Sequence, residues 1–170
     1  MADVTLEAGR VSIGDLLFVY LERAYAPAGP LAPGDVPRPH GVAPAAVTAP
    51  GEVVAAVAAG EVIWLGFQAV DPGRPVRIRV RVAGFEDSNL TCPPDTRLVG
   101  MPRAEGVEPF GATSEPSHGE TVQRLELAVW SPTAAAVAIE LVRPERFTRL
   151  TGMAASPIDP DAAYGGWRLP

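Results

Sequence analysis

Residues 76–82 of this chain are Val-Arg-Ile-Arg-Val-Arg-Val, with an apolar side chain at every even position and an arginine at every odd one. Successive side chains of a β-strand point to opposite faces of its sheet. The pattern therefore predicts a strand with one apolar and one cationic face. The apolar face needs a covering layer, so the segment favours a packed β-sheet domain.

Other segments on both sides extend this prediction. Residues 122–130 and 135–143 also alternate, and the turn Ser131-Pro132-Thr133 between them is typical of a hairpin. Residues 62–70 are rich in β-branched and aromatic side chains, which predicts a buried strand. Residues 1–10 fit an N-terminal arm or a short strand, with Val4 and Leu6 on one face. Further short strand candidates are 97–101, 147–150 and 166–169. The segment 52–59 fits a helix or a strand, and the rest of 86–121 is expected to be loop.

The segment 12–25 gives the clearest helix signal. Ser12 can cap its start, Asp15 follows three residues later, and Pro27 would end it. The apolar side chains at helical spacing are Leu16, Leu17, Tyr20, Leu21 and Ala24.

Residues 26–51 are dominated by proline, alanine and glycine. Proline cannot donate a hydrogen bond to a sheet, so this composition predicts a long extended arm or linker. The expected organisation is an N-terminal arm and helix (1–25), the Pro-rich arm (26–51) and a β-domain (52–170), within a single domain overall. The predicted fold class is mainly β: an antiparallel β-sandwich or partly open barrel with one N-terminal helix and a long Pro-rich arm.

Composition excludes several catalytic classes. All 14 basic residues are arginine, so the lysine of a phosphate-binding loop or a protein kinase is absent, and a Schiff base would need the N-terminal amine. The net charge of −6 disfavours duplex DNA and anionic lipid as partners. We therefore expect no nucleic-acid and no membrane partner.

Nucleophiles and metal ligands are sparse. Cys92 is the one cysteine, so an internal disulfide or a paired-cysteine metal site is excluded. His118 and Glu120 have the local spacing of a metal-binding pair but lack a nearby second histidine, since His40 lies in the arm. Asp159-Pro160-Asp161 is better explained as a turn than as a calcium loop. We expect no cofactor, no metal and no catalytic residue.

The candidate partner-binding residues lie on the polar strand face and in the arm. Arg77, Arg79 and Arg81 form either a surface for an acidic partner or a solvated face paired with Glu126 and Glu140. Trp130 shares the parity of the polar side chains of its strand, which suggests that a partner covers it. The candidate arm residues are Pro30, Pro33, Pro37 and Pro39.

These observations predict a structural or interaction protein, a subunit of a larger homomeric or heteromeric assembly of the particle-shell, tail or sheath type. Its partners would be proteins, including further copies of itself. The expected location is the cytoplasm or an assembled particle, because neither a signal peptide nor a transmembrane segment is recognisable. The alternative is a small-ligand-binding or catalytic β-domain that uses His118, Glu120 and the three arginines of 76–82.

Overall fold

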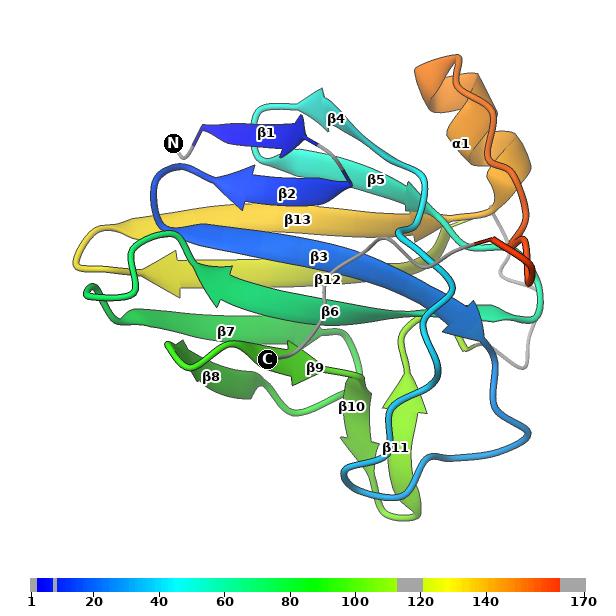
Figure 1. The fold of residues 1–170 in the computed structure, drawn as a ribbon, viewed down its shortest axis with the longest axis horizontal. Coiled ribbons are helices and arrows are strands. Elements are labelled where there is room, and N and C mark those ends of the chain that lie inside the picture. The colour runs from blue at the N-terminus through cyan, green and yellow to red at the C-terminus, as the bar shows by residue number, and fades with distance from the viewer. Residues whose placement is uncertain (1–2, 8, 113–120, 163–170) are drawn as a thin grey trace.

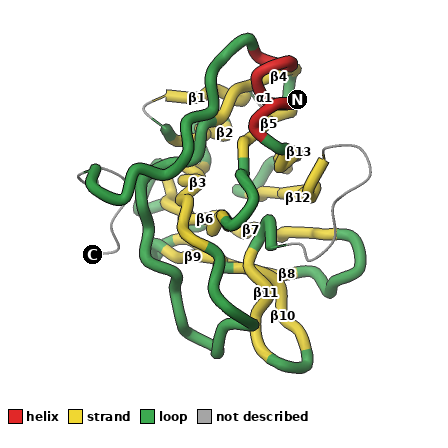
Figure 2. The backbone as a smooth tube through the Cα atoms, turned by 90° about the vertical axis from the view of Figure 1, so that its right-hand side faces the viewer, coloured by secondary structure: helices red, strands yellow, loops and turns green. Residues whose placement is uncertain are grey.

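The computed structural model describes residues 3–7, 9–112 and 121–162, which form three open β-sheets and one short helix (Figure 1). The two larger sheets lie face to face as the layers of a sandwich, which Figure 2 shows from the side. The five-stranded sheet contains, in order across the sheet, β1 (Val4–Glu7), β2 (Arg10–Ile13), β3 (Leu17–Tyr25), β6 (Glu61–Ala69) and β9 (Thr96–Leu98).

The six-stranded sheet carries the alternating segments. Its order is β4 (Ala45–Ala49), β5 (Glu52–Ala56), β13 (Ala134–Val142), β12 (Thr121–Trp130), β7 (Val76–Val82) and β8 (Ser88–Cys92). All neighbours are antiparallel except β5 and β13, which are parallel. A separate hairpin consists of β10 (Gly100–Arg103) and β11 (Gly106–Pro109). The mainly β prediction and the hairpin of 122–130 with 135–143 are confirmed.

The core lies between the two layers and follows from the alternation. All four apolar side chains of β7 are at most 4% exposed, and they pack in one cluster with Leu127 of β12 and Ile139 of β13. The opposite layer contributes Leu65 and Phe67 of β6 to the same cluster. Burial of apolar surface stabilises the fold by about 25 cal/mol per Å², so this cluster holds the layers together.

The predicted N-terminal helix is wrong, because residues 12–25 belong to β2, a turn and β3. Gly14 adopts a positive φ of 53° in the turn between the two strands. The β3 strand then pairs with β6 over nine consecutive positions, from Leu17 with Ala69 to Tyr25 with Glu61. This pairing satisfies the backbone of β3 and turns alternate side chains into the core, so tertiary contact overrides the helical spacing.

The observed helix is α1 (Pro144–Thr151), at the opposite end of the chain, and the strand predicted for 147–150 is therefore wrong. Pro144 begins the helix, where its missing N–H costs nothing, and Gly152 ends it with a φ of 72°. Phe147 is fully buried against Val54 and Val142, on the outer face of the six-stranded sheet. No helix in the described ranges has the length and apolar character needed to cross a membrane.

The Pro-rich segment is not confirmed as a separate arm, since it lies against its own domain and ends in β4. Its residues 40–43 run beside the second half of β3, with hydrogen bonds such as Ala43 N to Leu21 O at 2.8 Å. Further back, Leu31 pairs with Val107 of β11 through bonds of 3.0 and 2.8 Å. In Figure 1 the chain runs from the end of β3 to the β10–β11 hairpin and returns to β4.

The shorter candidates have mixed outcomes. Strands β1 and β5 occupy the 1–10 and 52–59 segments, and in the latter the strand alternative is correct. Residues 86–112 hold β8, β9, β10 and β11, so the loop expected there is largely wrong, and the 97–101 candidate is divided between β9 and β10. The 166–169 candidate lies outside the described residues.

Candidate protein-binding face

The three arginines of β7 and Trp130 lie on the outer face of the six-stranded sheet, as their parity predicts. Across the β7–β12 pair, Arg77 is directly opposite Trp130 and Arg81 is opposite Glu126. Residues directly opposite in an antiparallel pair point to the same face of the sheet. Arg77 and Arg81 are exposed, and Arg79 and Trp130 are half-buried. We call this outer surface of β8, β7, β12 and β13 the basic face.

Trp130 and Arg79 are in contact on the basic face, near the end of β12. The guanidinium carbon of Arg79 lies 5.2 Å from the centre of the Trp130 ring, within the range of a cation–π contact. A hollow of about 310 Å³ lies beside Trp130, and its polar lining residues are Arg77, Asn89 and Thr91. Within the described ranges the Arg77 side chain makes no ion pair, so its charge is available to a ligand in this hollow.

The other two arginines share a carboxylate. Asp87, just before β8, is 3.2 Å from Arg81 Nη2 and 3.8 Å from Arg79 Nε through the same oxygen. Arg81 donates to both carboxylate oxygens, at 3.3 and 3.2 Å. The hydrogen bond to Asp87, together with the negative charge of Asp87, raises the pKa of Arg81 above its ordinary value. The Asp87 side chain therefore occupies an anion position between two neighbouring arginines.

The expected pairing of the arginines with Glu126 and Glu140 is only partly correct. Glu126 lies opposite Arg81, but its ion pair is with Arg124, at 3.8 Å. Glu140 lies opposite Arg124 and instead accepts hydrogen bonds from Thr121 and from Arg146 of α1, at 2.6 and 3.4 Å. Glu126 therefore acts on Arg81 only through its nearby charge, while Glu140 has other partners.

A second hollow, of about 500 Å³, lies over β12 and β13. Its floor consists of small side chains that alternate along the two strands. These are Ala128, Ala134, Ala136 and Ala138. Arg79 lines this alanine trough while Trp130 lines the other hollow, so the stacked pair separates the two. At the far end Arg124 binds Glu52 through two bonds of 3.1 and 3.2 Å, and hydrogen bonding to Glu52 raises the Arg124 pKa.

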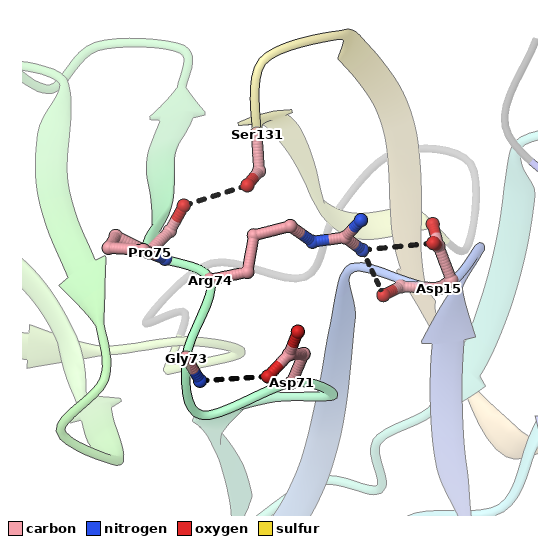
Figure 3. A network of polar contacts seen from close by, with 6 residues as sticks. All are labelled: Asp15, Asp71, Gly73, Arg74, Pro75 and Ser131. Carbon is pink, nitrogen blue, oxygen red and sulfur yellow. Dashed lines mark hydrogen bonds and ion pairs between the residues drawn. The ribbon is translucent and has the colours of Figure 1, made fainter.

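A polar network fixes the ends of the strands that carry Arg77 and Trp130 (Figure 3). Ser131, directly after Trp130, donates to the carbonyl of Pro75 at 2.8 Å, just before β7 begins. Arg74 contacts both the backbone carbonyl and the carboxylate of Asp15, the latter at 3.0 Å. The network joins the β12–β13 turn to the start of β7, and Arg74 joins the same loop to the turn after β2.

The remaining candidates do not form a site within the described residues. Cys92 is buried, and burial raises the pKa of its thiol to about 11, so the thiolate is scarce at neutral pH. His40 stacks edge-on against Tyr25, with ring centres 4.9 Å apart. Asp159 forms the expected turn, accepting from the Asp161 amide at 3.0 Å. Across the described ranges no group of three metal-ligating side chains gathers, and His118 and Glu120 lie outside those ranges.

The four arm prolines are not brought together with the basic face. Pro30 and Pro33 are exposed, while Pro37 and Pro39 are half-buried. Of the four, Pro30 lines a separate hollow of about 760 Å³ between the arm and the β10–β11 hairpin. Their role in partner binding stays a prediction.

Sequence reasoning missed several contributors to the basic face. Asp87 was placed in a loop, and nothing in its neighbourhood predicts that it reaches two arginines of β7. Asn89 and Thr91 alternate with the apolar Leu90 and Cys92, a strand signal that is present but short. The alternate alanines of 134–138 could have been recognised as a floor of small side chains.

Comparison with known proteins adds no constraint. No protein-family model, curated protein or solved structure matches this chain.

Proposed function

We propose that this chain is an interaction protein, a subunit of a larger homomeric or heteromeric assembly, and that a protein partner covers the basic face. The observation that carries the proposal is Trp130, an aromatic side chain among the charged residues of the outer sheet face at the end of β12, with the Arg79 guanidinium over its ring and Arg77 exposed opposite it. Tryptophan and arginine are the residues most enriched where partners bind tightly.

The shape of the face supports the same proposal. Its two hollows, of about 310 and 500 Å³, lie side by side, and the short alanine side chains let a partner approach the backbone of the sheet. A standard interface covers about 800 Å² on each partner, which requires a broad surface of this kind. The neighbouring part of the sheet, over β5, is already covered by Phe147 of α1.

The test is site-specific crosslinking in the organism that encodes the chain. A photoreactive benzoylphenylalanine replaces Thr91, an exposed residue that lines the smaller hollow. The matched control replaces Thr5, an exposed threonine on a strand of the other sheet. We expect one discrete covalent adduct from position 91 and none from position 5, with mass spectrometry of the adduct identifying a second copy or another protein.

Two results would count against the proposal. Equal, diffuse crosslinking from both positions would mean that the basic face has no specific partner. If the variant with benzoylphenylalanine at position 91 gives no adduct at any growth stage sampled, the basic face is exposed to solvent.

A further inference from the structure

We infer that the occupant of the basic face is an extended acidic segment of a protein partner, with one carboxylate bound to Arg77 in the smaller hollow. The inference rests on the proposed function and adds the chemistry of the partner. It follows from charge complementarity: β7 presents three arginines in a row, Asp87 pairs with Arg79 and Arg81, and Glu126 lies opposite Arg81, so the charge of Arg77 stays uncompensated among the described residues.

Asp87 is an internal example of the ligand that these arginines accept. Its carboxylate lies between Arg79 and Arg81 and receives two hydrogen bonds from the latter. Arginine pairs with carboxylates in this forked geometry because its donors are fixed in one plane. Arg77 is the third member of the same row and lacks such a partner among the described residues. The row thus has one filled and one open carboxylate position.

The geometry of the row favours an extended segment over a compact one. Alternate residues of a strand are about 6.8 Å apart along one face, so an extended peptide lying along β7 presents its alternate side chains at the spacing of the arginines. A carboxylate at one such position reaches Arg77, and the Asn89 and Thr91 side chains border the same hollow. Trp130 supplies an aromatic wall for the methylene groups of a glutamate.

The alanine trough gives the segment a second contact. Beyond the Arg79–Trp130 pair, its floor of alanines accommodates an apolar side chain of the partner. The charged side chains that line the trough are already paired: Arg124 with Glu52 and Glu126, and Arg79 and Arg81 with Asp87. The arrangement therefore fits an acidic residue over Arg77 followed by an apolar residue over the trough, where the charges are already paired.

The experiment measures binding of defined probes to the purified full chain by fluorescence anisotropy. The probes are a labelled eight-residue peptide of alternating glutamate and valine, the same peptide with glutamine in place of glutamate, and an eight-nucleotide thymidine oligonucleotide. We expect the glutamate peptide to bind at least about tenfold more tightly than either other probe, and its affinity to fall as salt rises.

Three variants locate the binding. Arg77→Gln should weaken the glutamate peptide about tenfold, whereas Arg38→Gln, which removes an exposed arginine from the arm and changes the net charge equally, should not. Asp87→Asn should strengthen binding several-fold, because it opens the second carboxylate position between Arg79 and Arg81. A gain of affinity cannot result from a misfolded variant, so this change keeps the test decisive.

Several outcomes would overturn the inference. They are equal weakening by Arg77→Gln and Arg38→Gln, equal binding of the glutamate and glutamine peptides, tighter binding of the oligonucleotide, and an unchanged affinity in Asp87→Asn. If a partner is crosslinked at position 91 but any of these results is obtained, the proposed function stands and the acidic character of the partner is rejected. Selective peptide binding without any crosslinked partner would reject the proposed function instead.

Discussion

Replacing Phe147 by alanine tests whether α1 is held on the sheet by a single side chain. Phe147 is the one buried residue of α1 and is 0% exposed. It packs in a small cluster with Val54, Ala56 and Val142, outside the main core. Phenylalanine-to-alanine changes in a core cost about 3–5 kcal/mol, and this peripheral cluster can partly collapse. We therefore expect a loss near the lower end, about 3 kcal/mol.

Urea unfolding followed by far-UV circular dichroism measures that loss. For a chain of this length, 1 kcal/mol corresponds to about 2–4 °C in Tm, so the thermal midpoint should fall by roughly 6–12 °C. The matched control is Leu150→Ala in the same helix, because Leu150 is 49% exposed and should change stability by less than about 0.5 kcal/mol. Wild-type stability of Phe147→Ala, or equal losses in both variants, would refute this account of α1 docking.

Three further predictions concern pH and the backbone. Burial raises the pKa of the Cys92 thiol from 9.0 to about 11 in the folded state. The wild-type protein should therefore lose stability relative to Cys92→Ala as the pH rises from 9 to 11, because the folded state resists ionisation of the thiol. Urea titrations at several pH values measure this difference. Equal pH profiles would contradict the burial argument. Gly106→Ala should lower the free energy of unfolding by about 1–3 kcal/mol, because φ is 133° and the new Cβ would overlap the backbone carbonyl of Leu31. Gly29→Ala is the control and should leave stability unchanged, because open space surrounds Gly29. Equal urea midpoints for the two variants would disprove this. Hydrogen bonding and charge from Arg74 lower the pKa of the Asp15 carboxyl below 3.8. The stability that the ion pair contributes is therefore present above pH 3.8 and is lost as the pH falls through the lowered pKa. In a carboxyl NMR titration, Arg74→Gln should return the Asp15 midpoint toward 3.8, and an unmoved midpoint would be inconsistent with the Arg74–Asp15 pair.

The alternating segments needed only local information. In β7, β12 and β13 every second side chain is apolar, and a strand is the one regular structure that buries such a set on one face. The parity of Arg77 and Trp130 followed from the same rule. Their direct opposition did not, because the β7–β12 register joins residues about fifty positions apart through pairs that a single segment cannot specify.

Two of the wrong predictions, the helix at 12–25 and the strand at 147–150, show where local patterns are ambiguous. In 12–25 the apolar residues satisfy a helical period, yet Leu17, Val19 and Leu21 also alternate, and pairing with β6 selects the strand. In 144–152 the better local signal was present, since Pro144 at the start and Gly152 at the end are typical helix boundaries. The apolar Phe147 and Leu150 suited either structure.

By itself the sequence determined the sheet-rich class, the polarity of each alternating face and the absence of lysine chemistry, since these depend on residue type and spacing alone. Tertiary structure decided the identity of β3, the docking of the Pro-rich segment on its own domain and the meeting of Asp87 with Arg79 and Arg81. The physical reason is that backbone pairing and ion pairs between distant segments depend on how the two layers pack, and a local pattern carries no record of that packing.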